Sequence, residues 1–153
     1  DKNDVGFMLV ERNVSEMSFD SIVKSLEAKK YTKYLSSVEC LLVVNSYETI
    51  KTYEERTEPE LLENLRIKQD CKEGLLPIPN FIEYNIASSL EFNKENYLKD
   101  FEIYILESKS GNHFKEFNLK PNAQMPVNWQ NGYSKGFAVD KLNKTVIYWG
   151  IIW

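Results

Sequence analysis

The run Gly136-Phe-Ala-Val-Asp140 is followed by Lys141-Leu-Asn143 and then by Lys144-Thr-Val-Ile-Tyr-Trp-Gly-Ile-Ile-Trp153. The first and last runs are rich in β-branched and aromatic residues, which favour strands. The segment between them carries aspartate and asparagine, which tolerate turn conformations. The sequence therefore predicts a C-terminal antiparallel hairpin over 136–140 and 145–152. Because the hairpin is so apolar, it must pack against something, and we expect Trp149 to be buried.

Alternation in the last strand divides its side chains between two faces. One face would hold Val146, Tyr148, Gly150 and Ile152, and the other Ile147, Trp149, Ile151 and Trp153. Both sets are apolar, which predicts a strand that is central in its sheet or covered on both sides.

Two helices are predicted in the first half of the chain. Ser18 is the expected N-cap of a helix that runs to about Lys30, with an apolar stripe at helical spacing formed by Phe19, Ile22, Val23 and Leu26. Thr57-Glu-Pro-Glu60 has the form of a capping box and would begin a second helix that ends near Gly74. Residues 81–90 fit a helix and a strand equally well.

The other predicted strands are 5–10, 38–44 and 101–106, and 113–119 is the expected hairpin partner of the last of these. Residues 120–133 contain two prolines and an Asn-Gly pair, which predicts an irregular loop. Helices come early and strands cluster late. The predicted fold class is therefore α+β, with a mainly antiparallel sheet and two or three helices in a single domain over 1–153.

Composition bounds the class of protein. Hydrophobic residues make up 42% and charged residues 27% of the chain, as in ordinary globular proteins. No apolar run approaches the ~20 residues of a membrane helix, so we expect no membrane insertion by this segment. The chain begins at Asp1 rather than methionine, which fits a removed leader, a trimmed membrane anchor or a shortened chain. Cytoplasmic and cell-envelope locations therefore both stay open.

Charge is unevenly distributed along the chain. Residues 48–63 carry six glutamates against Lys51 and Arg56, a net charge of −4, whereas residues 109–153 carry six lysines against Glu116 and Asp140, a net charge of +4. A long basic stripe of the kind that binds phosphates is absent, so we expect no nucleic-acid partner.

Cysteine and histidine are too scarce for a zinc site of the usual kind. The chain has two cysteines, Cys40 and Cys71, and one histidine, His113. We expect no metal and no cofactor. Cys40 lies in an apolar run and is expected to pack as a small hydrophobic residue, with its pairing to Cys71 left open. His113 stands beside Ser110-Gly-Asn112, where a turn residue is a better interpretation than a catalytic base.

Glu107-Ser-Lys109 matches half of a metal-dependent nuclease signature. Such chemistry needs a second carboxylate to share a magnesium ion. Asp100 is too distant along an extended strand, so Glu83 or Glu91 would have to approach through folding. The alternative is a solvated strand end, which we favour.

Aromatic residues suggest a second kind of surface. Trp129, Tyr133, Tyr148 and Trp153 would either form a binding face for a sugar or a protein or fill the core. A filled core is favoured because each ring buries so much area.

The sequence predicts a non-catalytic binding protein from a bacterium-like background rich in lysine and asparagine. Its most specific form is an inhibitor or immunity-type protein that presents an acidic surface to a basic partner protein. The predicted contact residues are Glu54, Glu55, Glu58 and Glu60. One alternative is an extracytoplasmic accessory domain that binds a small ligand or an envelope component. The other is the nuclease that would act through Glu107 and Lys109.

Overall fold

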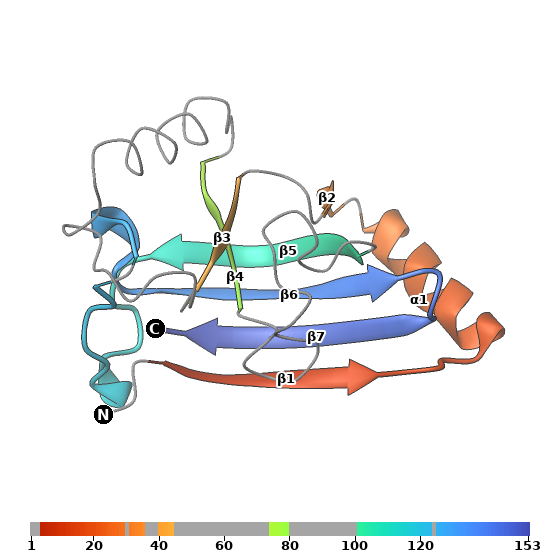
Figure 1. The fold of residues 1–153 in the computed structure, drawn as a ribbon, viewed down its shortest axis with the longest axis horizontal. Helices are drawn as coiled ribbons and strands as arrows, with labels where there is room; N and C mark the ends of the chain where they lie inside the picture. Colours follow the sequence, from red (N-terminus) through yellow and green to blue (C-terminus); the bar gives the residue numbers. More distant parts are fainter. Residues whose placement is uncertain (1–3, 30, 36–39, 45–73, 80–100, 124) are drawn as a thin grey trace, which may run out of the picture.

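The computed structural model describes residues 4–29, 31–35, 40–44, 74–79, 101–123 and 125–153. Its main feature is a five-stranded antiparallel sheet with the strand order β1-β7-β6-β5-β2 (Figure 1). The strands are β1 (Val5–Glu11), β2 (Lys33–Leu35), β5 (Phe101–Ser110), β6 (Gly132–Asp140) and β7 (Thr145–Ile152). A separate parallel pair consists of β3 (Leu41–Val43) and β4 (Leu76–Ile78). The described residues contain one α-helix, α1 (Glu16–Ala28), so the predicted α+β class with a mainly antiparallel sheet is confirmed in outline.

The predicted C-terminal hairpin is confirmed. β6 and β7 pair antiparallel from Asp140 opposite Thr145 to Tyr133 opposite Ile152. Asp140 orders the turn because its Oδ1 accepts hydrogen bonds from the backbone N–H groups of Leu142 and Asn143, at 2.9 and 3.0 Å. β6 begins at Gly132, so the last part of the predicted loop 120–133 is in fact a strand.

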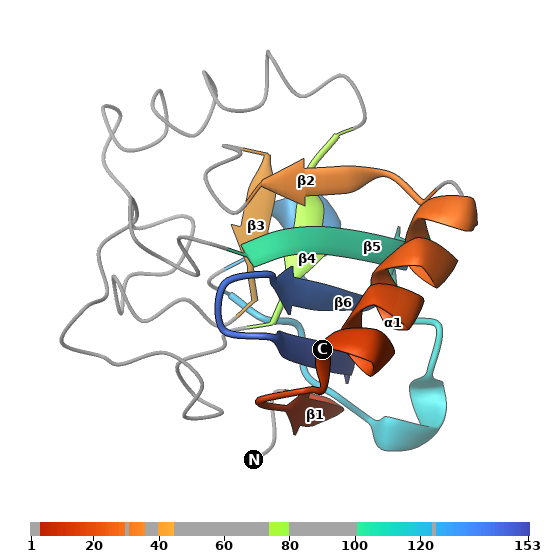
Figure 2. The ribbon, with the colours of Figure 1, turned by 90° about the vertical axis from the view of Figure 1, so that its right-hand side faces the viewer.

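The sheet is the middle of three layers, with α1 on one side and the β3–β4 pair on the other (Figure 2). We call these the helix side and the β3–β4 side. The β3–β4 side holds the larger core, in which Val44 and Ile78 pack with Ile147, Trp149 and Trp153. Trp149 is 1% exposed, as predicted. On the helix side, the described core residues of the sheet and helix are Phe19, Leu26, Tyr104, Phe137, Val139 and Val146.

The alternation predicted for β7 is confirmed by its neighbours. Its even-numbered side chains share the helix side with Phe137, and its odd-numbered side chains share the β3–β4 side with Ala138. β7 lies between β1 and β6, which is the central position that its two apolar faces require.

Helix α1 begins earlier than predicted. Ser15, not Ser18, is the N-cap, because the Oγ of Ser15 accepts a hydrogen bond from the backbone N–H of Ser18 at 3.3 Å. The apolar stripe is confirmed, with Phe19 and Leu26 buried and Ile22 and Val23 partly buried. The predicted second helix and residues 81–90 lie outside the described residues.

Two predictions around β5 are wrong. Residues 113–119 do not pair with it; Lys115–Phe117 is instead a 3₁₀ turn that ends at Asn118 with a φ of 48°. β6 is the partner of β5, because its long apolar run offers a full set of cross-strand contacts. β5 also continues to Ser110, so Glu107 and Lys109 lie within the strand.

The described part of the predicted strand 38–44 is β3, which pairs parallel with β4. Cys40, just before β3, forms a disulfide, which the sequence had left open. The one other cysteine in the sequence, Cys71, lies outside the described residues. None of the helices that the structure describes is long and apolar enough to cross a membrane.

Candidate functional site

Among the described residues, helix α1 covers only one half of the helix side of the sheet. Phe19 and Leu26 of α1 pack on the half that contains Tyr104 and Phe137. The other half carries side chains from four strands. We call this half the open face, and its members are Phe7, Leu9, Glu107, Lys109, Tyr133, Lys135 and Tyr148.

A β-bulge brings two of these residues onto the open face. In β5, Tyr104 lies opposite Phe137 on the helix side, and Ile105 lies opposite Gly136. The register then shifts at Leu106, so that Glu107 lies opposite Lys135 and Lys109 lies opposite Tyr133. Without the extra residue, strict alternation from Tyr104 would send Glu107 and Lys109 to the opposite face. The bulge therefore assembles the charged part of the open face.

Glu107 is the centre of a polar cluster, which we call the Glu107 cluster. Its Oε2 lies 2.6 Å from the Nζ of Lys135, and its Oε1 lies 3.4 Å from the Nζ of Lys109. Tyr133 donates a hydrogen bond from its hydroxyl to Oε1 at 2.7 Å. Hydrogen bonds from Lys135 and then Tyr133 lower the pKa of Glu107 to about 2. The carboxylate is therefore ionised at neutral pH, and its two oxygens are already occupied by three donors.

Two aromatic rings hold the phenol of Tyr133 in place. His113 and Phe114 each meet its ring edge to face, with centroid distances of 5.5 and 5.3 Å. A ring nitrogen of His113, Nε2, lies 2.8 Å from the backbone carbonyl oxygen of Ser110. This contact of His113 stabilises the turn after β5, which agrees with the interpretation of His113 as a turn residue.

The other part of the open face is apolar and exposed. Phe7 is 62% exposed and Leu9 is 55% exposed, and the two alternate along β1 with their side chains on the same side of the sheet. The ring of Phe7 lies over Gly150, whose missing side chain leaves room for it. Tyr148, opposite Leu9, is half-buried and continues the apolar surface toward the helix.

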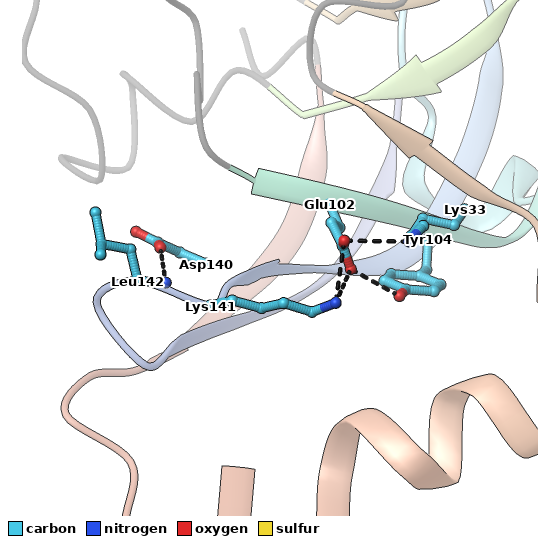
Figure 3. Close-up of polar contacts among 6 residues, drawn as sticks. All are labelled: Lys33, Glu102, Tyr104, Asp140, Lys141 and Leu142. Atoms are coloured by element: carbon cyan, nitrogen blue, oxygen red, sulfur yellow. Dashed lines mark hydrogen bonds and ion pairs between the residues drawn. The ribbon is translucent and has the colours of Figure 1, made fainter. Parts of the chain in front are cut away.

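A second polar cluster lies at the covered end of the same side of the sheet (Figure 3). Glu102 binds Lys33 and Lys141 at 3.1 Å each and accepts a hydrogen bond from the hydroxyl of Tyr104 at 3.1 Å. Burial raises the pKa of Glu102, but the hydrogen bonds and charges of the two lysines outweigh it and hold the pKa below its usual value. Burial, then the neighbouring Glu102 charge, raises the pKa of Tyr104 to about 12. Because Lys33, Glu102 and Lys141 come from β2, β5 and the β6–β7 turn, this cluster ties the sheet together.

The structure separates the four aromatic residues that the sequence grouped. Trp129 and Trp153 stack with a centroid distance of 6.0 Å, and Trp153 is buried in the core on the β3–β4 side. Tyr133 and Tyr148 lie on the helix side. A single aromatic face of all four residues is therefore wrong, and the filled core is the correct interpretation for Trp153.

The acidic contact residues Glu54, Glu55, Glu58 and Glu60 lie outside the described residues, so their role stays a prediction. Two lysines of the positively charged segment 109–153 pair with other carboxylates: the Nζ of Lys135 lies 2.6 Å from Glu107, and the Nζ of Lys144 lies 3.6 Å from Glu16.

The nuclease signature is also only partly described. Glu107 and Lys109 are in contact, whereas Asp100, Glu83 and Glu91 lie outside the described residues. Within the described ranges, no three histidine, cysteine or acidic side chains come together as a metal site.

Comparisons with protein-family models, with curated proteins and with solved structures find no match for this chain. The functional assignment therefore depends on the geometry of the chain itself. The sequence reasoning missed Phe7 and Leu9 as surface residues. Their alternation in β1 was visible in the sequence, but the half of the sheet that α1 leaves uncovered was not.

Proposed function

We propose that this chain is a non-catalytic binding domain that contacts a partner protein through the open face. The observation that supports this proposal is the exposure of Phe7 and Leu9 side by side on β1. Adjacent exposed apolar side chains with a polar rim are typical of protein interaction sites. The Glu107 cluster supplies such a rim, since Lys109 and Lys135 lie on the same face and are about half exposed.

The proposed contact has a defined chemistry. Phe7 and Leu9 would fill apolar pockets of the partner, and Tyr148 would add an amphipathic contact. The Glu107 cluster has two lysines for one carboxylate, so it would face neutral or acidic groups of the partner. The inhibitor or immunity-type hypothesis is a different form of binding protein, in which the acidic segment containing Glu54, Glu55, Glu58 and Glu60, rather than the open face, would bind a basic protein.

Affinity capture with paired variants tests the open face. The double variant Phe7→Ala/Leu9→Ala should lose most of any partner that wild-type protein captures from the source cells. The matched control is Met17→Ala/Leu142→Ala, because these two apolar side chains are also exposed but lie on α1 and on the β6–β7 turn. Equal capture by both double variants would show that the open face is not the contact surface.

A second candidate function is an extracytoplasmic accessory domain that binds a small ligand or an envelope component. The disulfide at Cys40 favours it, because such bonds persist mainly in oxidising compartments. Thiol labelling of protein isolated from the source cells under non-reducing conditions, combined with cell fractionation, tests this candidate. We expect blocked thiols and an envelope fraction; fully labelled cysteines in a cytoplasmic fraction would exclude it.

A further inference from the structure

Strand β1 is an edge strand whose outward backbone groups can be assigned from the register. Gly132 and Trp153 exchange both backbone hydrogen bonds, at 3.0 Å each, so the odd-numbered residues of β7 bond to β6. The even-numbered residues of β7 therefore bond to β1, where their partners are the odd-numbered residues from Val5 to Glu11. It follows that the N–H and C=O groups of Gly6, Met8 and Val10 point away from the sheet. Within the described residues, these groups have no hydrogen-bond partner.

The two edges of the sheet differ in how well they are protected against pairing with a further strand. β2, at the opposite edge, has three residues and begins with Lys33. β1 has seven residues, Val-Gly-Phe-Met-Leu-Val-Glu, and its only charge is at Glu11. Short edge strands and edge lysines hinder the addition of further strands, whereas a long edge strand with few charges can pair with another strand. β1 is therefore the edge at which another strand can add.

We propose that the strand that adds to β1 is the β1 strand of a second copy of this chain. The centre of Val5–Glu11 is Met8, whose backbone groups point outward. A two-fold axis at Met8 therefore pairs all seven residues of one strand with all seven of the other, antiparallel and with hydrogen bonds in phase. In this register, Phe7 lies opposite Leu9 of the second copy in a non-hydrogen-bonded pair, where side chains approach most closely.

Charge complementarity favours a second copy over a strand of another protein. The same register places Asp4, just before β1, opposite Arg12 of the second copy, just after β1. The two-fold axis repeats this pairing at the other end, so each end of the joint pairs Asp4 with Arg12, while Glu11 lies opposite the uncharged Val5. If one strand is shifted along the other, the seven residues no longer overlap fully, and Asp4 no longer lies opposite Arg12 at either end. The apolar centre of β1 and the two charged residues that flank the strand, Asp4 and Arg12, are thus self-complementary.

The dimer would join the two sheets into one and bring the two open faces side by side. This inference does not depend on the proposed function, because strand pairing uses the edge of β1 and leaves the face of the sheet uncovered. A chain that dimerises but captures no partner would support this inference and contradict the proposed function. A chain that stays monomeric but captures a partner would contradict this inference and support the proposed function.

Sedimentation velocity over a wide range of protein concentration tests the proposal. We expect a monomer–dimer equilibrium for wild-type protein and a monomer at every concentration for Met8→Pro. Proline at this position removes an outward N–H and spares the bonds to β7, so the variant should stay folded by circular dichroism. A wild-type monomer throughout, or a dimer that persists in folded Met8→Pro, would overturn the proposal.

A charge swap tests the register even if Met8→Pro does not fold. Arg12→Asp should weaken dimerisation about tenfold or more, because it places two acidic residues opposite each other at both ends of the joint. The double variant Asp4→Arg/Arg12→Asp should restore most of the lost affinity. A dissociation constant unchanged by Arg12→Asp, or a double variant as weak as the single one, would overturn the register centred on Met8.

Discussion

The indole nitrogen of Trp149 donates a hydrogen bond to the hydroxyl oxygen of Ser134, with the two atoms 3.4 Å apart. Ser134 in turn donates to the backbone carbonyl oxygen of Pro77 at 2.6 Å. These two bonds connect β7, β6 and β4, so they link the five-stranded sheet to the β3–β4 pair. Ser134 is 1% exposed, and the bonds therefore lie in an environment where a missing partner is costly.

Ser134→Ala should lower the free energy of unfolding by about 1–3 kcal/mol, because it leaves the carbonyl of Pro77 without its buried donor. Urea unfolding measures the loss. Ser108→Ala is the matched control, since Ser108 lies directly opposite Ser134 on β5 and its hydroxyl has no hydrogen bond within the described residues. We expect the control to change stability by less than about 0.5 kcal/mol. Equal losses in both variants would show that the bond to Pro77 contributes little.

Trp149→Ala should lower the free energy of unfolding by about 3–5 kcal/mol, since the ring is fully buried and its loss opens a cavity. The ring lies over Gly136, where an added side chain would come within 2.8 Å of its atom Cη2. Met17→Ala, at the most exposed of the large apolar residues in the described part of the chain, should be nearly neutral. A loss below about 1 kcal/mol for Trp149→Ala in urea unfolding would contradict the burial of the ring.

The sequence contains enough information to place the hairpin and Trp149, because the strand period and the turn residues agree over the whole segment. It could not distinguish Ser15 from Ser18 as the helix cap, since both precede the apolar stripe of α1 and either hydroxyl is a suitable cap. The sequence also did not predict the bulge at Leu106. The bulge inserts one residue into the alternation of β5, and no glycine, proline or other turn residue marks its position. The open face depends on that bulge and on where α1 docks, and both are tertiary features.

Acid should weaken the fold through Glu107. Its pKa is about 2 in the folded chain and near 4.5 in the unfolded chain, so the unfolded state binds a proton first as the pH falls. The stabilisation is therefore complete above about pH 4.5 and decreases as the pH falls toward 2. Glu107→Gln should show a flatter decline of unfolding free energy over this window, measured by urea unfolding at several pH values. Glu116→Gln, at an exposed glutamate of the 3₁₀ turn, is the matched control.

Purified protein should not cut nucleic acid in the presence of Mg²⁺ or Mn²⁺. Both oxygens of Glu107 are held by Lys135, Lys109 and Tyr133, so a metal ion would have to displace these donors. Cleavage of single- and double-stranded substrates can be followed by gel electrophoresis. Reproducible cutting that Glu107→Gln abolishes would establish the nuclease alternative and contradict the non-catalytic proposal.

Charge reversal in the acidic segment distinguishes the two surfaces proposed for the partner. If Glu54, Glu55 and Glu58 bind a basic protein, replacing all three with lysine should slow association and reduce its dependence on salt, with little change in folding stability. The reason is that charges at the rim of an interface act mainly on the rate of encounter. Surface plasmon resonance with the captured partner, at several salt concentrations, measures both effects.

The open-face variant Phe7→Ala/Leu9→Ala provides the comparison for this experiment. Loss of apolar anchors should speed dissociation and leave the salt dependence of association unchanged, because it removes contact area without altering charge. Slower association only in the acidic-segment variant would support the inhibitor or immunity-type hypothesis and contradict contact through the open face. Faster dissociation only in the open-face variant would place the contact on the sheet, and the acidic segment would then have no part in binding.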